Sequence, residues 1–301
     1  MKFPLRPPPV EGAAEVRVVA PAGAVRREEL EAGIALLEHR FRIGWTSGAF
    51  ERHGYLAGDD DRRAGELQSA LDDPGVGAVL AARGGYGTTR IIDRIALDGL
   101  GRAPRWIAGS SDLTALLLRV WSELGLVTAH GPMVASLPRQ RRDLELLCGL
   151  LAGGSWRAPH GLEELERGAA EGPLLGGNLA ILAHLCGTID PDLFEGAILL
   201  LEEVGERPYR VDRYLVQLER SGVLERVAGF LIGELTGCES ERGPGALEVM
   251  AERLCGRGAP VAAGYPAAHG QRNVPFPHGA IVRLEVGAGG VSLGEKRGGS
   301  P

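Results

Sequence analysis

Residues 105–124 read RWIAGSSDLTALLLRVWSEL, and this stretch carries the strongest information about the fold. An apolar run is followed by a corner of small residues and then by apolar residues at helical spacing, which predicts a buried strand, a tight turn and a helix. Two interpretations of the turn are open. Ser110, Ser111 and Asp112 could cap the first turn of the helix, or the turn could be a nucleophile elbow that presents one serine hydroxyl. Taken alone, the stretch favours the cap.

The same strand-turn-helix pattern occurs twice upstream. VRVVAPAG (residues 16–23) and GVGAVLAARGGYG (residues 75–87) are apolar runs that end in glycine turns, and each precedes a helical pattern. Buried strands that alternate with helices predict a parallel α/β sheet. Functional groups in such sheets gather at the carboxyl ends of the strands. The glycine loop Arg83–Gly87 and Ser111 both belong to that edge.

The second half of the chain is less regular. Residues 153–172, GGSWRAPHGLEELERGAAEG, are rich in glycine and acidic residues and lack apolar periodicity, which predicts a linker between a domain of residues 1–152 and one of residues 173–301. GPLLGGNLAILAHL (residues 172–185) predicts a turn and a helix, and GAILLLEEVGE (residues 196–206) predicts a strand that ends in carboxylates. We therefore expect a mixed α/β second domain.

Composition excludes several classes of protein. The 301 residues carry a formal net charge of −6, so the basic surface that nucleic-acid binding requires is absent. The first fifteen residues lack the apolar core of a secretory signal, and no apolar run approaches the length of a membrane span. The cysteines, whose spacing suggests neither a disulfide framework nor a zinc site, are Cys148, Cys186, Cys238 and Cys255. We expect a cytoplasmic protein that binds neither nucleic acid nor membrane.

The glycine loop Arg83–Gly87, RGGYG, has more than one interpretation. A dinucleotide fingerprint would need glycine at position 90, where Arg90 stands, and no Gly-Lys-Ser/Thr sequence follows. The loop is then either a tight turn that needs positive φ, or a place where a main-chain N–H faces a reacting oxygen.

Carboxylates and histidines in the second half are further candidates. Glu202 and Glu203 follow a run of leucines, so Glu202 in particular could stay partly buried, although carboxylates at such a place are more often solvated. His269 and His278 share one loop, and their spacing supports no metal site. Serine, glutamate and histidine come in one of the orders that catalytic triads use, but Leu113 departs from the G-x-S-x-G motif of α/β-hydrolases.

Six motifs decide between these readings. In chain order they are VVAPAG (18–23), RGGYG (83–87), GSSDLT (109–114), GGNL (176–179), LEEVGERPYRVDR (201–213) and GYPAAHGQRNVPFPHG (264–279). Together they resemble the LD-carboxypeptidase family of serine peptidases, over nearly the whole chain. Two positions depart from the family pattern, because Ser110 replaces the usual aromatic residue and Ala268 precedes His269 where glycine is common. Neither change removes a residue of the implied triad.

The resemblance implies a Rossmann/flavodoxin-like N-terminal domain with a parallel sheet and a mixed α/β swivelling C-terminal domain, assembled as a homodimer. It implies that Ser111 is the nucleophile, His269 the general base and Glu202 the acid that orients the histidine. The implied oxyanion donors are the main-chain N–H groups of Gly85 and Asp112. No metal and no organic cofactor is needed.

The implied substrate is a small peptide, the murein tetrapeptide, from which the enzyme releases terminal D-alanine during cell-wall recycling. A free carboxylate on that substrate calls for a cation or exposed N–H groups. Arg83 and Arg210 are candidates for this contact, and Tyr86 of the glycine loop is a further candidate for substrate binding.

Two other functions compete with this one. The microcin-immunity branch of the same superfamily cleaves aminoacyl or peptidyl nucleotides, and the length of the chain and its ERPYRVDR sequence favour the murein branch. A non-catalytic module that binds small ligands at the edge of the sheet is the alternative from another class. A covalent probe for Ser111 would separate that module from an enzyme.

Overall fold

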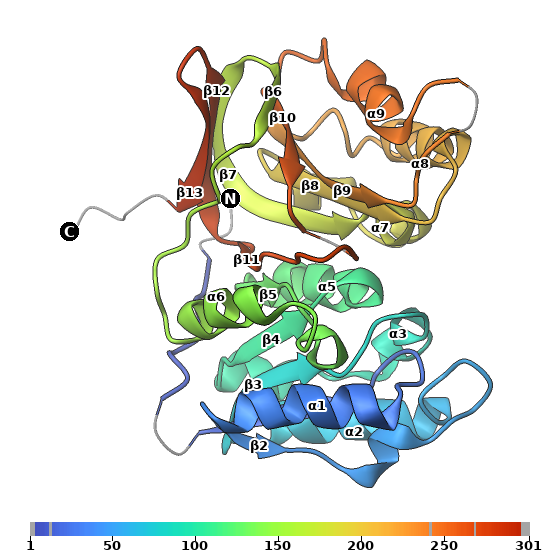
Figure 1. Ribbon diagram of the computed structural model, residues 1–301, viewed down its shortest axis with the longest axis vertical. Helices are drawn as coiled ribbons and strands as arrows, with labels where there is room; N and C mark the ends of the chain where they lie inside the picture. Colours follow the sequence, from blue (N-terminus) through green and yellow to red (C-terminus); the bar gives the residue numbers. More distant parts are fainter. Residues whose placement is uncertain (1–3, 12–13, 241–242, 268, 296–301) are drawn as a thin grey trace. The chain divides into compact units, whose positions relative to one another are not determined.

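The computed structural model describes residues 4–11, 14–240, 243–267 and 269–295 (Figure 1). The chain forms two compact units, each with its own β-sheet. The first unit comprises residues 1–154 together with 273–276, and the second comprises residues 155–272 and 277–301. The α/β class with one parallel-rich sheet is thereby confirmed.

The first unit is a doubly wound α/β domain. Its sheet has the strand order β11-β5-β4-β3-β1-β2, with parallel pairing from β2 through β5. The strands are β1 (Glu15–Val19), β2 (Arg42–Gly44), β3 (Val76–Ala81), β4 (Trp106–Gly109), β5 (Thr128–His130) and β11 (Phe276–His278), of which only Phe276 is counted in this unit. The helices are α1 (Arg27–Glu38), α2 (Asp60–Asp72), α3 (Thr88–Ile91), α4 (Asp98–Arg102), α5 (Thr114–Leu124) and α6 (Arg141–Leu151).

The order 2-1-3-4-5 of the first five strands is that of flavodoxin-like folds, in which ligands bind where the strand order reverses. Here the reversal lies between β1 and β3. The loop after β1 and the glycine loop after β3 meet there, since Gly23 N donates to Gly84 O at 3.0 Å.

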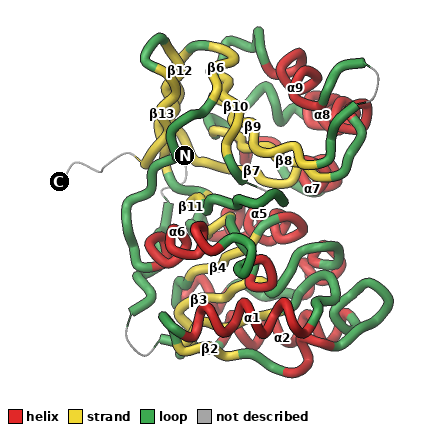
Figure 2. Tube along the Cα trace, in the orientation of Figure 1, coloured by secondary structure: helices red, strands yellow, loops and turns green. Residues whose placement is uncertain are grey.

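Apolar periodicity explains how the helices of this unit attach to the sheet. Helix α2 contributes Leu67 and Leu71, and α5 contributes Leu116 and Val120, to one buried cluster with β3 and β4. Figure 2 shows these helices in red and these strands in yellow. The carboxyl ends of β3 and β4 are thereby fixed by a packed core, which makes them a rigid base for the loops that follow.

The second unit contains a mixed seven-stranded sheet with the order β13-β12-β7-β8-β9-β10-β6. Its strands are β6 (Glu163–Glu166), β7 (Gly168–Asn178), β8 (Ile198–Val204), β9 (Gly229–Thr236), β10 (Val261–Tyr265), β12 (Ile281–Gly287) and β13 (Gly290–Glu295). The run from β7 to β10 is parallel, and the outer strands pair antiparallel. The helices α7 (Leu179–Leu185), α8 (Pro208–Arg220) and α9 (Ala246–Leu254) connect the parallel strands. The mixed α/β expectation for this half is confirmed.

Two local predictions are wrong. Residues 153–172 do not form a linker, because they contain β6 and the beginning of β7, which pair with β10 and β12. The first residues of β7 are largely exposed, so their composition resembles that of a loop. The expected turn within residues 172–185 is also strand, up to Asn178. Gly176 is required there, because a Cβ at this position would lie 2.0 Å from Leu200 O of β8.

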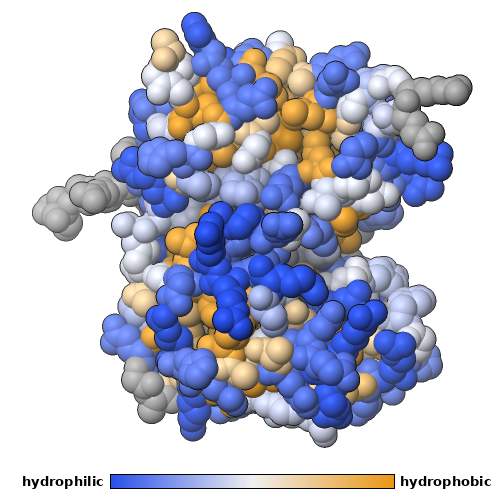
Figure 3. Space-filling view, in the orientation of Figure 1, coloured by the Kyte–Doolittle hydropathy of each residue, from blue (hydrophilic) through white to orange (hydrophobic). Residues whose placement is uncertain are grey.

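The surface is ordinary for a globular protein. On the face that Figure 3 presents, hydrophilic residues cover much of the surface and apolar residues are exposed between them. In the described part of the chain, no helix is both long and apolar enough to cross a bilayer.

Candidate functional site

The turn between β4 and α5 has the strained backbone that the nucleophile-elbow interpretation predicts. Ser111 has φ +60, and it is the one non-glycine residue with positive φ in the described part of the chain. This conformation costs a non-glycine residue about 1–3 kcal/mol, and such strain concentrates at functional sites. Neither N-cap position makes a side-chain capping bond, whether Ser110 before the short 3₁₀ turn or Leu113 before α5. The cap interpretation is therefore wrong.

The two serines of the turn have different surroundings. Ser110 is buried, with 2% of its surface exposed, and its Oγ accepts a hydrogen bond from Asn273 Nδ2 at 3.2 Å. Ser111 is partly exposed. The strained backbone thus presents Ser111, whereas Ser110 is a buried structural residue.

The glycine loop lies against Ser111. A Cβ added to Gly84 would be 3.0 Å from Ser111 Cβ and 3.2 Å from its Oγ, so only glycine leaves the serine its present room. Gly85 has φ +107, which a side chain would oppose. The main-chain N–H groups of Gly85 and of Asp112, the residue after Ser111, belong to the two segments that border the hydroxyl. Two main-chain N–H donors in such positions can stabilise a developing oxyanion.

The second unit holds the predicted acid and base. Glu202 of β8 is fully buried, and its Oε2 lies 3.3 Å from Nδ1 of His269 in the loop after β10. Gly233 of β9 makes room for the base of this side chain, because a Cβ there would lie 2.9 Å from Glu202 Cβ. Ala268, the family departure next to the histidine, lies outside the described residues.

Nearby carboxylates raise the pKa of the His269 imidazole. Burial works to lower the pKa of the imidazole, but Glu202, and more weakly Glu203 and Glu234, outweigh burial and hold the pKa above its ordinary value. A histidine paired with a buried carboxylate in this way is suited to accept a proton and to be stabilised as imidazolium.

Glu203 has a different role from its neighbour Glu202. Successive strand residues point to opposite faces, and Glu203 accepts hydrogen bonds from Asn178 Nδ2 at 3.0 Å and from Ala180 N at 2.8 Å at the start of α7. Burial raises the pKa of its carboxyl. Glu203 thus ties α7 to β8, and the expectation that the carboxylates at this strand end would be solvated is wrong for both.

His278 is unsuited to act as a base. It lies in β11 with no exposed surface, and burial lowers its pKa to about 3. It therefore stays neutral at physiological pH and out of contact with solvent.

The three weaker candidates lie on the surface. Arg83 donates from Nη1 to Ala24 O at 2.7 Å. Tyr86 is 46% exposed, with its ring centroid 5.9 Å from that of Tyr55. Arg210 of α8 is exposed and is paired with Glu206, its Nη1 lying 3.1 Å from Oε2.

Sequence reasoning missed several buried polar residues around these groups. Arg63 and Asn273 are the clearest cases. Asn273 belongs to the motif GYPAAHGQRNVPFPHG, so the family resemblance marks its position, but the resemblance implies no role for it. Arg63 stands in a run of charged residues, DDDRRAGE, whose pattern is that of a solvated helix face.

Comparison with known proteins identifies the family. The chain matches the LD-carboxypeptidase N-terminal domain over residues 16–131 and the LD-carboxypeptidase C-terminal domain over residues 171–284. It therefore belongs to the LD-carboxypeptidase family, as the six motifs predict, and its relatives place it among peptidases. A Streptomyces coelicolor protein named only provisionally as a carboxypeptidase is 40% identical over 97% of both chains. The murein tetrapeptide carboxypeptidase of Pseudomonas aeruginosa is 32% identical over 92% of this chain and 94% of its own.

Solved structures show the same fold. The muramoyltetrapeptide carboxypeptidase of Oxalobacter formigenes is 27% identical with a TM-score of 0.82, covering 94% of this chain and 99% of its own. The microcin C7 self-immunity protein MccF superposes with a TM-score of 0.86, covering 99% of this chain and 100% of its own, at 19% identity. The second likeness is one of fold alone.

Proposed function

We propose that this protein is a serine carboxypeptidase that cleaves the amide between an L-configured centre and terminal D-alanine in murein tetrapeptides. The observation that carries the proposal is the left-handed backbone of Ser111, φ +60, at a strand-to-helix turn bordered by Gly84, in a member of the LD-carboxypeptidase family. The murein tetrapeptide carboxypeptidase among its relatives supports the choice of substrate.

In the proposed mechanism Ser111 Oγ attacks the scissile carbonyl while His269 takes the hydroxyl proton. Glu202 stabilises the imidazolium that results, since it lies 3.3 Å from the other ring nitrogen. The N–H groups of Gly85 and Asp112 receive the oxyanion. His269 then protonates the leaving amine, D-alanine departs, and water hydrolyses the acyl-enzyme by the same steps. In each of these reaction steps His269 accepts or donates the proton that is transferred.

The biological setting follows from the substrate. A carboxypeptidase specific for tetrapeptides would act on released wall fragments, so we place the protein in cell-wall recycling in the cytoplasm. The homodimer is a separate proposal, which the family resemblance implies. Sedimentation at working concentration tests the dimer, and a monomer alone would contradict it.

Product analysis by mass spectrometry tests the reaction. Purified protein is incubated with a murein tetrapeptide and, separately, with aspartyl sulfamoyl adenosine, a compound found bound to MccF. We expect D-alanine from the first and no cleavage of the second. Cleavage of the nucleotide alone would replace our proposal with an immunity peptidase. Failure of Ser111 to react with a fluorophosphonate would favour a non-catalytic binding module.

A further inference from the structure

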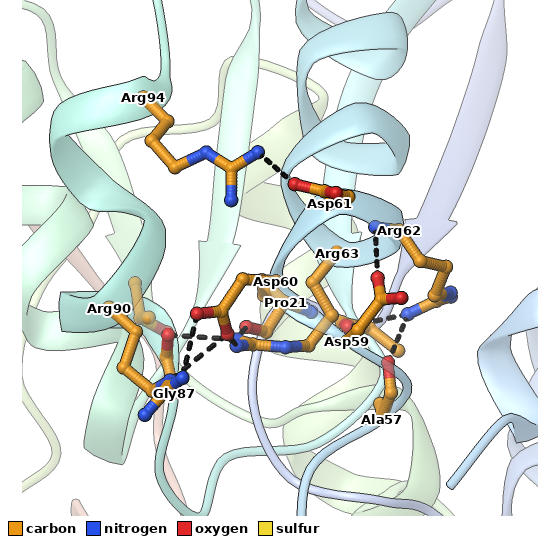
Figure 4. A network of polar contacts seen from close by, with 12 residues as sticks. Pro21, Ala57, Asp59, Asp60, Asp61, Arg62, Arg63, Gly87, Arg90 and Arg94 are labelled. Carbon is orange, nitrogen blue, oxygen red and sulfur yellow. Dashed lines mark hydrogen bonds and ion pairs between the residues drawn. The ribbon is translucent and has the colours of Figure 1, made fainter. Parts of the chain in front are cut away.

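Arg63 of α2 is a fully buried arginine to which the proposed mechanism gives no role. Its Nη1 donates to Pro21 O at 2.6 Å and to Gly87 O at 2.8 Å, and its Nη2 is paired with Asp60 (Figure 4). Pro21 belongs to the loop after β1, and Gly87 ends the glycine loop after β3. One guanidinium therefore joins the two loops that meet where the strand order reverses.

A buried carboxyl group bonds to the main chain at the same point. Asp112 Oδ2 accepts a hydrogen bond from Thr88 N at 2.7 Å. The carbonyl of Gly87 and the N–H of Thr88 are the two ends of one peptide group. Arg63 and Asp112 thus hold that peptide between them, and we call this arrangement the peptide clamp.

The clamp leaves little freedom to the glycine loop. Gly87 has φ +137, and a Cβ there would lie 2.6 Å from Arg63 Nη1, so the guanidinium occupies the space of a side chain. Burying a charge is costly, and an apolar residue of similar size would fill space at lower cost. The two terminal nitrogens of Arg63 instead bond to Asp60 and to the carbonyls of Pro21 and Gly87.

We propose that Arg63 is a positioning residue for the oxyanion donors of the reaction. The clamp joins the glycine loop, two residues after Gly85, to the side chain of Asp112, whose own N–H is the second donor. It therefore fixes the two donors relative to each other and to Ser111 between them. This inference rests on the proposed function, in which those N–H groups receive the oxyanion.

Two readouts separate positioning from simple packing. The first is the rate at which a fluorophosphonate labels Ser111, because the adduct is tetrahedral and places an oxygen in the hole. The second is the separate measurement of kcat and KM for tetrapeptide. For Arg63→Met we expect labelling and kcat to fall about 10²–10³-fold, the effect of losing one oxyanion donor. KM should change less than about threefold, because the oxyanion that these donors receive forms only in the transition state.

Conservative variants can replace Arg63→Met in this experiment if Arg63→Met does not fold. Arg63→Lys retains the charge but cannot hold both carbonyls in the fixed geometry of a guanidinium. We expect it to label about tenfold more slowly than the wild type, between the wild type and Arg63→Met. Asp112→Asn keeps an oxygen acceptor for Thr88 N, and it should lose less labelling rate than Asp112→Ala.

Arg62 supplies the matched control on the same helix. Its Nη1 also donates to main-chain carbonyls, Ala20 O at 3.1 Å and Ala57 O at 2.7 Å, but not to the glycine loop. Arg62→Met should lower the melting temperature and leave the labelling rate within about threefold of the wild type.

The outcomes distinguish this inference from the proposed function. If folded Arg63→Met or Arg63→Lys labels at the wild-type rate, Arg63 only packs and the inference is overturned. If the Arg62 and Arg63 variants slow labelling equally, the effect is general loosening and the inference again fails. If the wild-type protein is labelled at Ser111 but releases no D-alanine, the proposed substrate is refuted. The labelling rates of the Arg63 variants would still test the peptide clamp.

Discussion

Asn273 donates a hydrogen bond from Nδ2 to Oγ of Ser110 at 3.2 Å, and its main-chain N–H donates to Asp143 Oδ2 at 2.7 Å. All three residues are buried. Asn273 follows His269 by four positions, yet residues 273–276 belong to the first compact unit. The segment after the proposed base is therefore anchored beside the residue that precedes the proposed nucleophile. Ser110, which replaces the usual aromatic residue of the family, supplies the acceptor.

This contact predicts different results for the two serines. Ser111→Ala should remove nearly all turnover, leaving the residual 10³–10⁴-fold acceleration over water that binding and an oxyanion hole give on their own, to order of magnitude. Ser110→Ala should keep turnover within about tenfold of the wild type, because its hydroxyl is engaged in structure. D-alanine release by both variants checks the assignment, and greater damage from Ser110→Ala would reverse it.

The hydrogen bond between Asn273 and Ser110 also predicts that substitutions of these two residues have coupled effects on the free energy of unfolding. Asn273→Ala leaves Ser110 Oγ buried without its donor, which should cost about 1–3 kcal/mol of unfolding free energy. The double variant with Ser110→Ala should lose about 0.5–1.5 kcal/mol less than the sum of the single changes, because both remove the same bond. Urea unfolding measures the three values. Strict additivity would show that the bond contributes nothing to stability.

The pattern of residues predicts some of these features and not others. Apolar runs that end in glycine identify β1, β3 and β4, because these strands are buried on both faces and leave a continuous signal. The conformation of Ser111 could not be predicted from its turn alone, since a cap and an elbow use the same residue types. The partner of Asp112 proved to be Thr88 N, which is 24 residues away in the chain.

The predictions that the structure contradicts share a physical cause, which is pairing or packing between residues far apart in the chain. Residues 168–171 have the composition of a loop, yet they pair with β12, more than a hundred residues later. Arg63 looks solvated because its neighbours are charged, and only the packing of α2 against the two loops buries it. Composition reports local preference, whereas these positions are determined by elements distant in the chain.

The contact between Gly84 and Ser111 predicts a steric effect on catalysis. Gly84→Ala places a Cβ 3.0 Å from Ser111 Cβ, so the serine must move by a few tenths of an ångström. A displaced nucleophile should cost about 10–100-fold in kcat. Gly149→Ala in α6 is the control, because nothing lies within 4 Å of a Cβ there and alanine favours a helix by about 0.5–1 kcal/mol. Wild-type kcat in Gly84→Ala would contradict the proposed role of this loop.

The carboxylates around His269 predict a shifted pH profile. A base must be deprotonated, and the neighbouring carboxylates hold the pKa of His269 above its ordinary value of 6.5. We therefore expect kcat/KM to fall as the pH drops through a value above 6.5. Glu202→Gln removes the largest raising influence and leaves burial opposed only by the weaker effects of Glu203 and Glu234, so the acid limb should move to lower pH. Its maximum should also drop by about 10²–10⁴-fold, because the imidazolium loses its partner.

A matched carboxylate variant completes that experiment. Glu206→Gln removes a carboxylate that pairs with Arg210 and is not among the main influences on the pKa of His269, so its acid limb should stay in place. If Glu206→Gln moved the limb as Glu202→Gln does, the effect would come from net charge. An unmoved limb in Glu202→Gln would remove Glu202 from the proposed triad.

The proposed chemistry predicts that the enzyme acts on tetrapeptide and spares pentapeptide. In the tetrapeptide the scissile amide joins an L-centre to D-alanine, whereas the terminal amide of the pentapeptide joins two D-centres. Inverting one α-carbon while the side chains keep their contacts moves the carbonyl away from Ser111 and from the N–H groups of Gly85 and Asp112. Because a displacement of about 1 Å can cost 10²-fold in rate, we expect D-alanine release from pentapeptide to be slower by at least about that factor. Mass spectrometry of both peptides under one set of conditions measures the ratio, and comparable release from the two would show that the configuration of the acyl centre does not set the specificity.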